Sequence, residues 1–308
     1  MAGLADTFPE SLPEFQRMFP DDGACAAYLE ALRWPEGFVC PRCGGTEFWR
    51  MKQARLLCRA CRRQCSVTVG TIFQDSRLPL TLWFRAMWHL TSQKNGASAL
   101  GVQRVLGLGS YQTAWAWLQK LRRAMVRPGR DDLAGAVQVD ETYVGGEKSG
   151  KSGRGAAGKS LVLIAAQIEK GRIGRIRLQQ VANASGAVLL EAVQTMVCPG
   201  STVQTDGWGG YSQFSKHGYV HEVVRESAEM GENLLPACHQ TASLLKRWIL
   251  GTHQGAVSHE HLAYYLDEFT FRFNRRKSHS RGKLFYRLAQ QAVLVEPAPY
   301  STLVKRHP

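Results

Sequence analysis

The spacing of apolar positions changes near residue 136 and divides the chain into a helical first part and a second part that opens with strands. Before that point, segments 80–93, 97–106 and 111–125 repeat apolar residues at helical spacing. After it, 136–144, 161–168 and 172–181 have the length and pattern of strands, followed by a helix over 185–196 and a fourth strand over 201–206. This order predicts a mixed α/β protein.

Two more helices are expected, one near each end of the chain. Asp21 or Asp22 can cap a helix that ends near Trp34. A helix over 258–276 repeats Leu262, Leu266 and other apolar residues on one side, which indicates a face packed on the sheet.

Two Cys-x-x-Cys pairs enclose the 14 residues 44–57 and indicate a metal site. Each pair offers two thiolates from one tight turn, and four thiolates satisfy a tetrahedral Zn²⁺. We therefore predict a structural zinc ribbon with ligands Cys40, Cys43, Cys58 and Cys61; the alternative is four unrelated core cysteines. Cys65 lies one residue too far from Cys61 for a further pair and is interpreted as a packed thiol.

The net charge of +14 is unevenly distributed along the 308 residues. Residues 50–126 hold thirteen Lys or Arg and one acidic residue, Asp75. Beside a zinc module this excess favours a polyanionic partner, most often nucleic acid, although a solvated basic surface is the alternative.

The chain shows neither a secretory signal at its start nor an apolar stretch of the roughly 20 residues that span a bilayer. The remaining cysteines are scattered, which is typical of reduced thiols. We expect a cytoplasmic, nucleoid-associated protein without membrane contact.

The three short helices before residue 130 resemble a helix-turn-helix, because a Gly-containing turn at 107–109 joins the last two. The final helix carries Lys120, Arg122 and Arg123, which we predict to contact DNA. The alternative is an ordinary helical hairpin whose Trp115 and Trp117 are partly core.

Two aspartates occupy strand positions in the second part of the chain. Asp140 lies inside the first strand and Asp206 ends the fourth. If these strands are neighbours, both carboxylates can share divalent cations, and paired Mg²⁺ ions roughly 3.5 to 4 Å apart promote phosphoryl transfer. The alternative for each aspartate taken alone is a structural role in a turn or at a helix cap.

Five segments carry a close resemblance to bacterial insertion-sequence transposases of the DDE superfamily with an N-terminal zinc ribbon: 33–43, 139–146, 205–211, 244–253 and 265–276. The resemblance covers most of residues 20–290. It implies a ribonuclease-H-like fold, recognition of terminal inverted repeats, and DNA cleavage and strand transfer with Mg²⁺ or Mn²⁺.

The resemblance also implies a third metal ligand seven positions before Lys246, where this chain has His239 instead of an acid. Seven residues are nearly two helical turns, so both side chains share one face. An imidazole nitrogen suits Mn²⁺ better than Mg²⁺, and histidine in place of an acid removes one negative charge from the metal site. The alternative ligands are Glu229, Glu232 and the acidic residues 267–268. These residues could instead be solvated on the surface, and Glu268 could pair with Arg272 or Arg275.

We therefore predict a DNA transposase with catalytic residues Asp140, Asp206, His239 and Lys246. Lys246 would contact a phosphate; the alternative is a structural role on a solvated helix face. The alternatives are a non-catalytic DNA-binding regulator and a host nuclease. Because two DNA ends must meet, we expect a homo-oligomer on double-stranded DNA. The predicted DNA contacts are Lys120, Arg122, Arg123, Lys148, Lys151, Arg154, Lys159, Arg247, Arg272, Arg275 and Arg276.

The expected domain boundaries follow the changes in pattern. They are an N-terminal helical segment (1–36), the zinc ribbon (37–70), a helix-turn-helix-like segment (71–130), a ribonuclease-H-like catalytic domain (131–290) and a tail (291–308).

Overall fold

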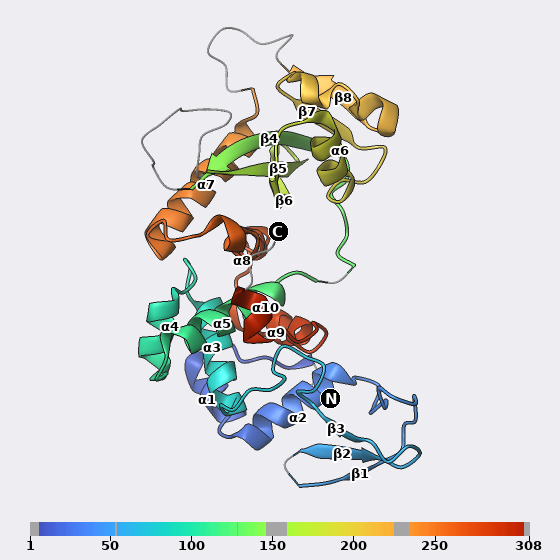
Figure 1. The fold of residues 1–308 in the computed structure, drawn as a ribbon, viewed down its shortest axis with the longest axis vertical. Coiled ribbons are helices and arrows are strands. Elements are labelled where there is room, and N and C mark those ends of the chain that lie inside the picture. Colours follow the sequence, from blue (N-terminus) through green and yellow to red (C-terminus); the bar gives the residue numbers. More distant parts are fainter. Residues whose placement is uncertain (1–5, 53, 128, 146–158, 225–233, 305–308) are drawn as a thin grey trace. The chain divides into compact units, whose positions relative to one another are not determined.

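A computed structural model describes residues 6–52, 54–127, 129–145, 159–224 and 234–304, which form two compact units (Figure 1). Of these described residues, those up to 127 and those in 277–304 belong to the first unit, and those in 129–276 form the second. Within the described ranges, no helix is both long enough and apolar enough to cross a membrane.

The first unit combines a small antiparallel sheet with helices. The sheet comprises β1 (Phe48–Arg50), β2 (Arg55–Cys58) and β3 (Gln64–Ser66) in that order. The helices are α1 (Leu12–Met18), α2 (Asp22–Arg33), α3 (Leu80–Ser92), α4 (Ala99–Leu106), α5 (Tyr111–Arg123), α9 (Arg281–Ala292) and α10 (Tyr300–Val304). Asp21 caps α2 by accepting a hydrogen bond from the Ala24 N–H at 2.8 Å.

A helix from the C-terminal part of the chain completes the core of this first unit. Phe285 of α9 is fully buried, and its ring lies 5.5 Å from Phe15, 5.7 Å from Phe84 and 6.0 Å from Trp88 between centroids. Aromatic packing of this kind buries a large apolar area. Residues 277–290, expected within the catalytic domain, and residues 291–304 of the expected tail thus group with the N-terminal helices.

The second unit is built on a five-stranded mixed sheet in the order β6-β5-β4-β7-β8. Strands β4 (Ala136–Val144), β5 (Ser160–Glu169) and β6 (Arg172–Val181) are antiparallel neighbours. Strands β7 (Thr202–Thr205) and β8 (Val220–Val223) follow helix α6 (Gly186–Gln194) and run parallel to β4. The predicted mixed α/β fold is confirmed.

Helices cover both faces of this sheet (Figure 1). Val137 and Val139 of β4 enter a core with α6. On the other face, residues of β5 pack with α7 (Pro236–His253) and α8 (Leu262–Asn274). Because successive strand residues alternate in direction, Gln138 and Asp140 face the side of α7.

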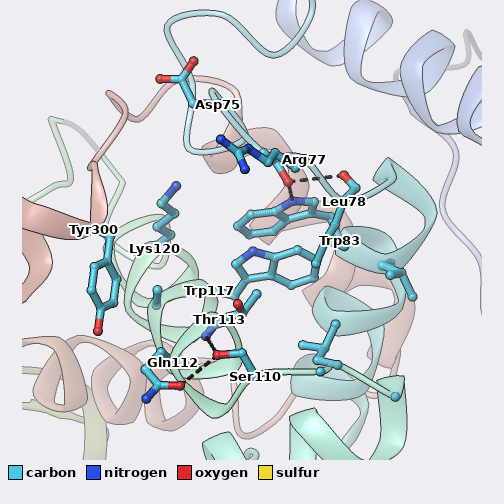
Figure 2. A pocket seen from close by; sticks show the side chains of 16 residues that line it. Asp75, Arg77, Leu78, Trp83, Ser110, Gln112, Thr113, Trp117, Lys120 and Tyr300 are labelled. Carbon is cyan, nitrogen blue, oxygen red and sulfur yellow. Dashed lines mark hydrogen bonds between the residues drawn. The ribbon is translucent and has the colours of Figure 1, made fainter.

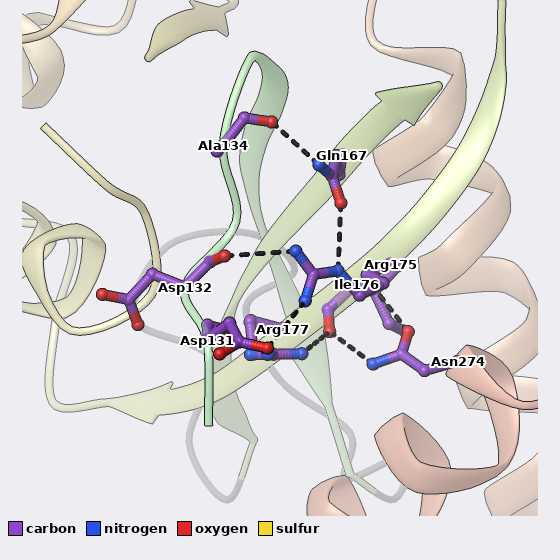
Figure 3. A network of polar contacts seen from close by, with 8 residues as sticks. All are labelled: Asp131, Asp132, Ala134, Gln167, Arg175, Ile176, Arg177 and Asn274. Carbon is purple, nitrogen blue, oxygen red and sulfur yellow. Dashed lines mark hydrogen bonds and ion pairs between the residues drawn. The ribbon is translucent and has the colours of Figure 1, made fainter. Parts of the chain in front are cut away.

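Two arginines of β6 hold the segment that leads into β4 (Figure 3). Arg177 donates to the carbonyl oxygen of Asp131 at 2.6 Å, and Arg175 donates to that of Asp132 at 3.2 Å. Arg177 is buried, and burial lowers its pKa to about 10. These contacts fix the start of β4 and therefore the position of Asp140 along the sheet.

Candidate active site and zinc centre

Four cysteine sulfurs of the first unit lie close enough to bind one ion. Cys40 Sγ is 3.7 Å from Cys61 Sγ, Cys43 Sγ is 3.5 Å from Cys58 Sγ, and all four lie within 4.8 Å of one another. A tetrahedral Zn²⁺ with Zn–S bonds of about 2.3 Å sets its sulfurs roughly 3.8 Å apart. The four thiols fit that geometry, while Cys65 is a buried neighbour outside the cluster.

Of the two predicted catalytic aspartates, Asp140 lies on β4 and Asp206 directly follows β7, the parallel neighbour of β4. Strand β4 pairs with β7 in the register Val137↔Val203 and Gln138↔Gln204. Continued by two residues, that register sets Asp140 beside Asp206. Asp206 follows the last residue of β7 and accepts a hydrogen bond from the Trp208 N–H at 2.9 Å, which holds the turn after the strand.

A row of hydrogen-bonded polar side chains connects β4, β7 and β8 near these aspartates. Gln138 donates to Gln204 at 3.4 Å, and Gln204 donates to Glu222 of β8 at 3.0 Å. Gln138 also accepts a hydrogen bond from the Ala237 N–H of α7 at 2.9 Å, which satisfies an unpaired donor at the start of that helix. Sequence analysis missed this role, although a glutamine between the buried valines of β4 was its signal.

Helix α7 presents the predicted third ligand to Asp140. His239 Nε2 lies 3.4 Å from Asp140 Oδ2, and the His239 side chain is 53% exposed. The helix begins at Pro236, so His239 is in its first turn, where the helix dipole favours negative charge nearby. Lys246 is exposed on the same helix, two turns further along.

Asp140 is in an environment that disfavours its ionised form. Its side chain is 19% exposed, and burial together with the charge of Glu141 raises its pKa to about 6. Asp206 adds to this effect, whereas a backbone hydrogen bond and His239 oppose it. Clustered carboxylates that repel one another in a partly buried place are stabilised by a bound cation.

The aspartates and His239 form a more open set than the cysteines. In the part of the chain that the structure describes, the cysteine cluster is the one group of three or more ligands whose atoms all lie within 4.8 Å. Two ions roughly 3.5 to 4 Å apart need ligands spread more widely than one ion does. The donor atoms of the aspartates and His239, carboxylate oxygens and an imidazole nitrogen, are of the types that bind Mg²⁺ or Mn²⁺.

Both parts of the chain match families of known proteins. Residues 132–274 match the family described as ISXO2-like transposase domain, and residues 20–64 match the transposase zinc-ribbon domain. Together these matches take in more than half of the chain. The chain belongs to the insertion-sequence transposases with an N-terminal zinc ribbon. A Halobacterium salinarum protein described as an uncharacterized protein in transposable element ISH50 is 27% identical over 277 residues, covering 83% of this chain and 92% of that protein.

Two residues near the aspartates have structural partners in this transposase. The Tyr211 hydroxyl donates to the Glu141 carboxylate, and Tyr211 is fully buried. Burial and the charge of Glu141 raise the pKa of Tyr211 far above its ordinary value. Tyr211 therefore has no face open for stacking on a substrate, whereas Trp208 is 39% exposed.

The buried carboxylate of Glu268 is paired within α8. Arg272 Nε lies 2.9 Å and Nη2 2.8 Å from Glu268 Oε1, and the two side chains are 11% and 0% exposed. This confirms the structural interpretation of Glu268 and corrects the expectation that Arg272 contacts DNA, because its guanidinium is turned into the fold.

Removing Arg272 should destabilise the second unit. In Arg272→Met the buried Glu268 carboxylate loses its facing guanidinium, so we expect unfolding free energy to fall by about 3 to 5 kcal/mol. Adding Glu268→Gln should restore part of the loss. Thermal denaturation measures both, with exposed Arg247→Met as the matched control; an Arg272→Met protein as stable as the control contradicts the pairing.

The predicted contacts on α5 are only partly accessible. Arg122 is 1% exposed and donates to Gln119 within the unit, which corrects its assignment to a DNA-facing surface. Lys120 is half-buried, and burial lowers its pKa although Asp75 opposes the shift. Arg123 is partly exposed.

A pocket of about 600 Å³ lies beside the turn between α4 and α5 (Figure 2). Trp83 and Trp117 stack beside it with ring centroids 4.0 Å apart, and Lys120 and Tyr300 also line it. The tryptophans are thus core residues, as the hairpin alternative expected for Trp117.

The other predicted basic residues differ in accessibility. Arg247 is exposed, whereas Lys159 is partly buried. Arg275 lies over the Phe271 ring at 4.0 Å, and Arg276 lies over Phe273 at 4.1 Å and donates to the Gly174 carbonyl. The following predicted residues lie outside the described ranges: Lys148, Lys151, Arg154, Glu229 and Glu232.

Proposed function

We propose that this transposase cuts the ends of its element and joins them to target DNA with divalent ions held by Asp140, Asp206 and His239. The observation that supports this most directly is the position of Asp140, 3.4 Å from His239 and on a strand that pairs in parallel with the strand that Asp206 follows. This arrangement supports a shared site formed by residues from two strands and one helix.

The chain supplies the ligands and the positioning for this reaction. Bound Mg²⁺ or Mn²⁺ would supply Lewis acidity at the phosphate and an activated water. Asp140 and Asp206 would offer carboxylate oxygens, and the His239 imidazole would offer one nitrogen. Lys246, which is exposed on α7, would contact a phosphate of the DNA strand.

The proposed chemistry has two phosphoryl-transfer steps. Water attacks phosphorus at the element end, the bond to the 3′ oxygen breaks, and a free 3′-hydroxyl and a 5′-phosphate result. That hydroxyl then loses its proton and attacks a phosphorus of target DNA, which releases the target's 3′ oxygen. Neither step needs a covalent protein intermediate.

The basic surfaces would hold the DNA. We assign the zinc ribbon and the α4–α5 region to the terminal inverted repeats, and Lys159 and Arg247 to phosphates near the reacting end. Insertion joins two element ends, so two or more copies would assemble on DNA. A strict one-to-one complex on cognate end DNA contradicts that assembly.

Joining of a pre-cut element end tests this function. With Mn²⁺ or Mg²⁺, the full-length protein should convert labelled end DNA and a target plasmid into joined product. Cleavage without joining would favour a nuclease, and binding without either reaction would favour a regulator; both results contradict the proposal.

The role of His239 predicts a change in ion preference. His239→Glu adds a hard oxygen ligand, so Mg²⁺ should support joining at a larger fraction of the Mn²⁺ rate than in the parent. His239→Ala should slow joining by about 10- to 100-fold with either ion. Gln240→Ala, at the next exposed position of α7, is the control. A His239→Ala protein that joins at the parent rate rules out a ligand at this position.

A further inference from the structure

The two cysteine turns of the zinc ribbon end at residues of different kinds in the same conformation. Gly44 and Arg62 both follow the second cysteine of a pair, with φ of 72° and 58°. Each N–H donates to the carbonyl oxygen of the first cysteine, Gly44 to Cys40 at 2.9 Å and Arg62 to Cys58 at 3.0 Å. Left-handed backbone suits glycine but costs other residues roughly 1 to 2 kcal/mol. Arg62 therefore keeps a strained backbone that a glycine would relieve.

The strained arginine stacks on an exposed tryptophan. Arg62 Cζ lies 4.5 Å and Arg59 Cζ 5.3 Å from the centroid of the Trp49 ring. Trp49, on β1, is 40% exposed, and both arginines are exposed. Phe48, the neighbour of Trp49 on β1, packs against the buried core of Phe38, Leu56 and the cysteines, so Trp49 points to the other face of the small sheet.

Positive charge surrounds this cluster. Residues 50–66 contain six Lys or Arg and no acidic residue. Arg59 is paired with Glu47 at 3.1 Å, but both side chains are at least half exposed, so the pair is weak in water. Arg50 pairs with Glu30 at 2.7 Å, but the excess of basic residues over this segment still complements a polyanion.

We propose that Trp49, Arg59 and Arg62 form the surface through which the zinc ribbon binds the backbone of element-end DNA. The two guanidinium groups would contact phosphates, and the indole would pack on a deoxyribose between them. Strain at Arg62 is consistent with this, because strained residues persist where their side chain has a function. This inference rests on the proposed function, since it takes the element end as the ligand.

Arg62→Gly separates binding from folding, because it removes the guanidinium and relieves the backbone. The zinc-loaded full-length protein is titrated with labelled element-end duplex in buffer with Ca²⁺ at several salt concentrations. We expect Arg62→Gly to weaken binding by about 3- to 10-fold and to lower the slope of log affinity against log salt by about 1. Its thermal midpoint should equal or exceed that of the parent. Trp49→Ala should weaken binding several-fold with little change in the slope.

Arg42→Gln is the matched control, because Arg42 is an exposed arginine of the other cysteine turn. It should reduce affinity less than Arg62→Gly. Parent-like affinity and slope in Arg62→Gly, or equal losses in both variants, overturn the proposed surface. Strand transfer is measured separately. If the parent joins ends and Arg62→Gly binds DNA like the parent, only the proposed surface is refuted. If Arg62→Gly loses binding but the parent joins no ends, only the catalytic proposal is refuted.

Discussion

Asp140→Asn should abolish end joining while leaving the fold and DNA binding in place. Asparagine keeps the shape of the side chain but lacks the anionic oxygen that a divalent ion requires. Because the paired aspartates act as one unit, we expect Asp140→Asn, Asp206→Asn and the double variant each to lower the rate by at least about 10³-fold, without additivity. Single-turnover joining of pre-cut ends measures the loss.

Asp132→Asn is the matched control for these variants, since its carboxylate precedes the same sheet but lies outside the proposed site. It should join ends at a rate close to the parent. An Asp140→Asn protein that still joins ends within about tenfold of the parent would remove the aspartate pair from the reaction.

Removal of zinc should have the second large effect, on the first unit. Binding of a structural Zn²⁺ contributes about 10 to 16 kcal/mol in zinc-finger peptides, and this energy supports folding. Cys58→Ser, or chelation of the parent, should therefore unfold the small β1–β3 sheet and abolish specific end binding. Zinc content, near-ultraviolet circular dichroism and binding to end DNA measure the change.

Cys65→Ala provides the comparison within the same sheet, because Cys65 is buried there but lies outside the cysteine cluster. It should retain zinc and end binding with only a modest loss of stability. If Cys58→Ser kept full zinc content and parent-like binding, the four-cysteine site would be wrong.

Local spacing made several features predictable from sequence. The cysteine turns are defined within four residues, so Cys40, Cys43, Cys58 and Cys61 could be named without knowledge of the fold. Strand β4 was evident from its apolar pattern, whereas the adjacency of β4 and β7, on which a shared site depends, was only a condition at that point. His239 was named only through the family resemblance, since its approach to Asp140 depends on how α7 packs.

Features that depend on long-range packing could not be predicted. Phe285 completes a core with Phe15 and Phe84, far earlier in the chain, and no local pattern indicates that pairing. Arg122 and Arg272 looked like surface cations because charge alone gives no burial. The row through Gln138 and Gln204 became apparent only once β4 and β7 were adjacent.

Anomalous scattering from Mn²⁺ in crystals of the full-length protein with end DNA tests the central claim most directly. The account predicts a peak between the carboxylates of Asp140 and Asp206, with His239 as a further ligand and the same peak weakened in His239→Ala. Mn²⁺ bound by one aspartate alone, or found only away from both, would contradict a shared ion and with it the proposed chemistry.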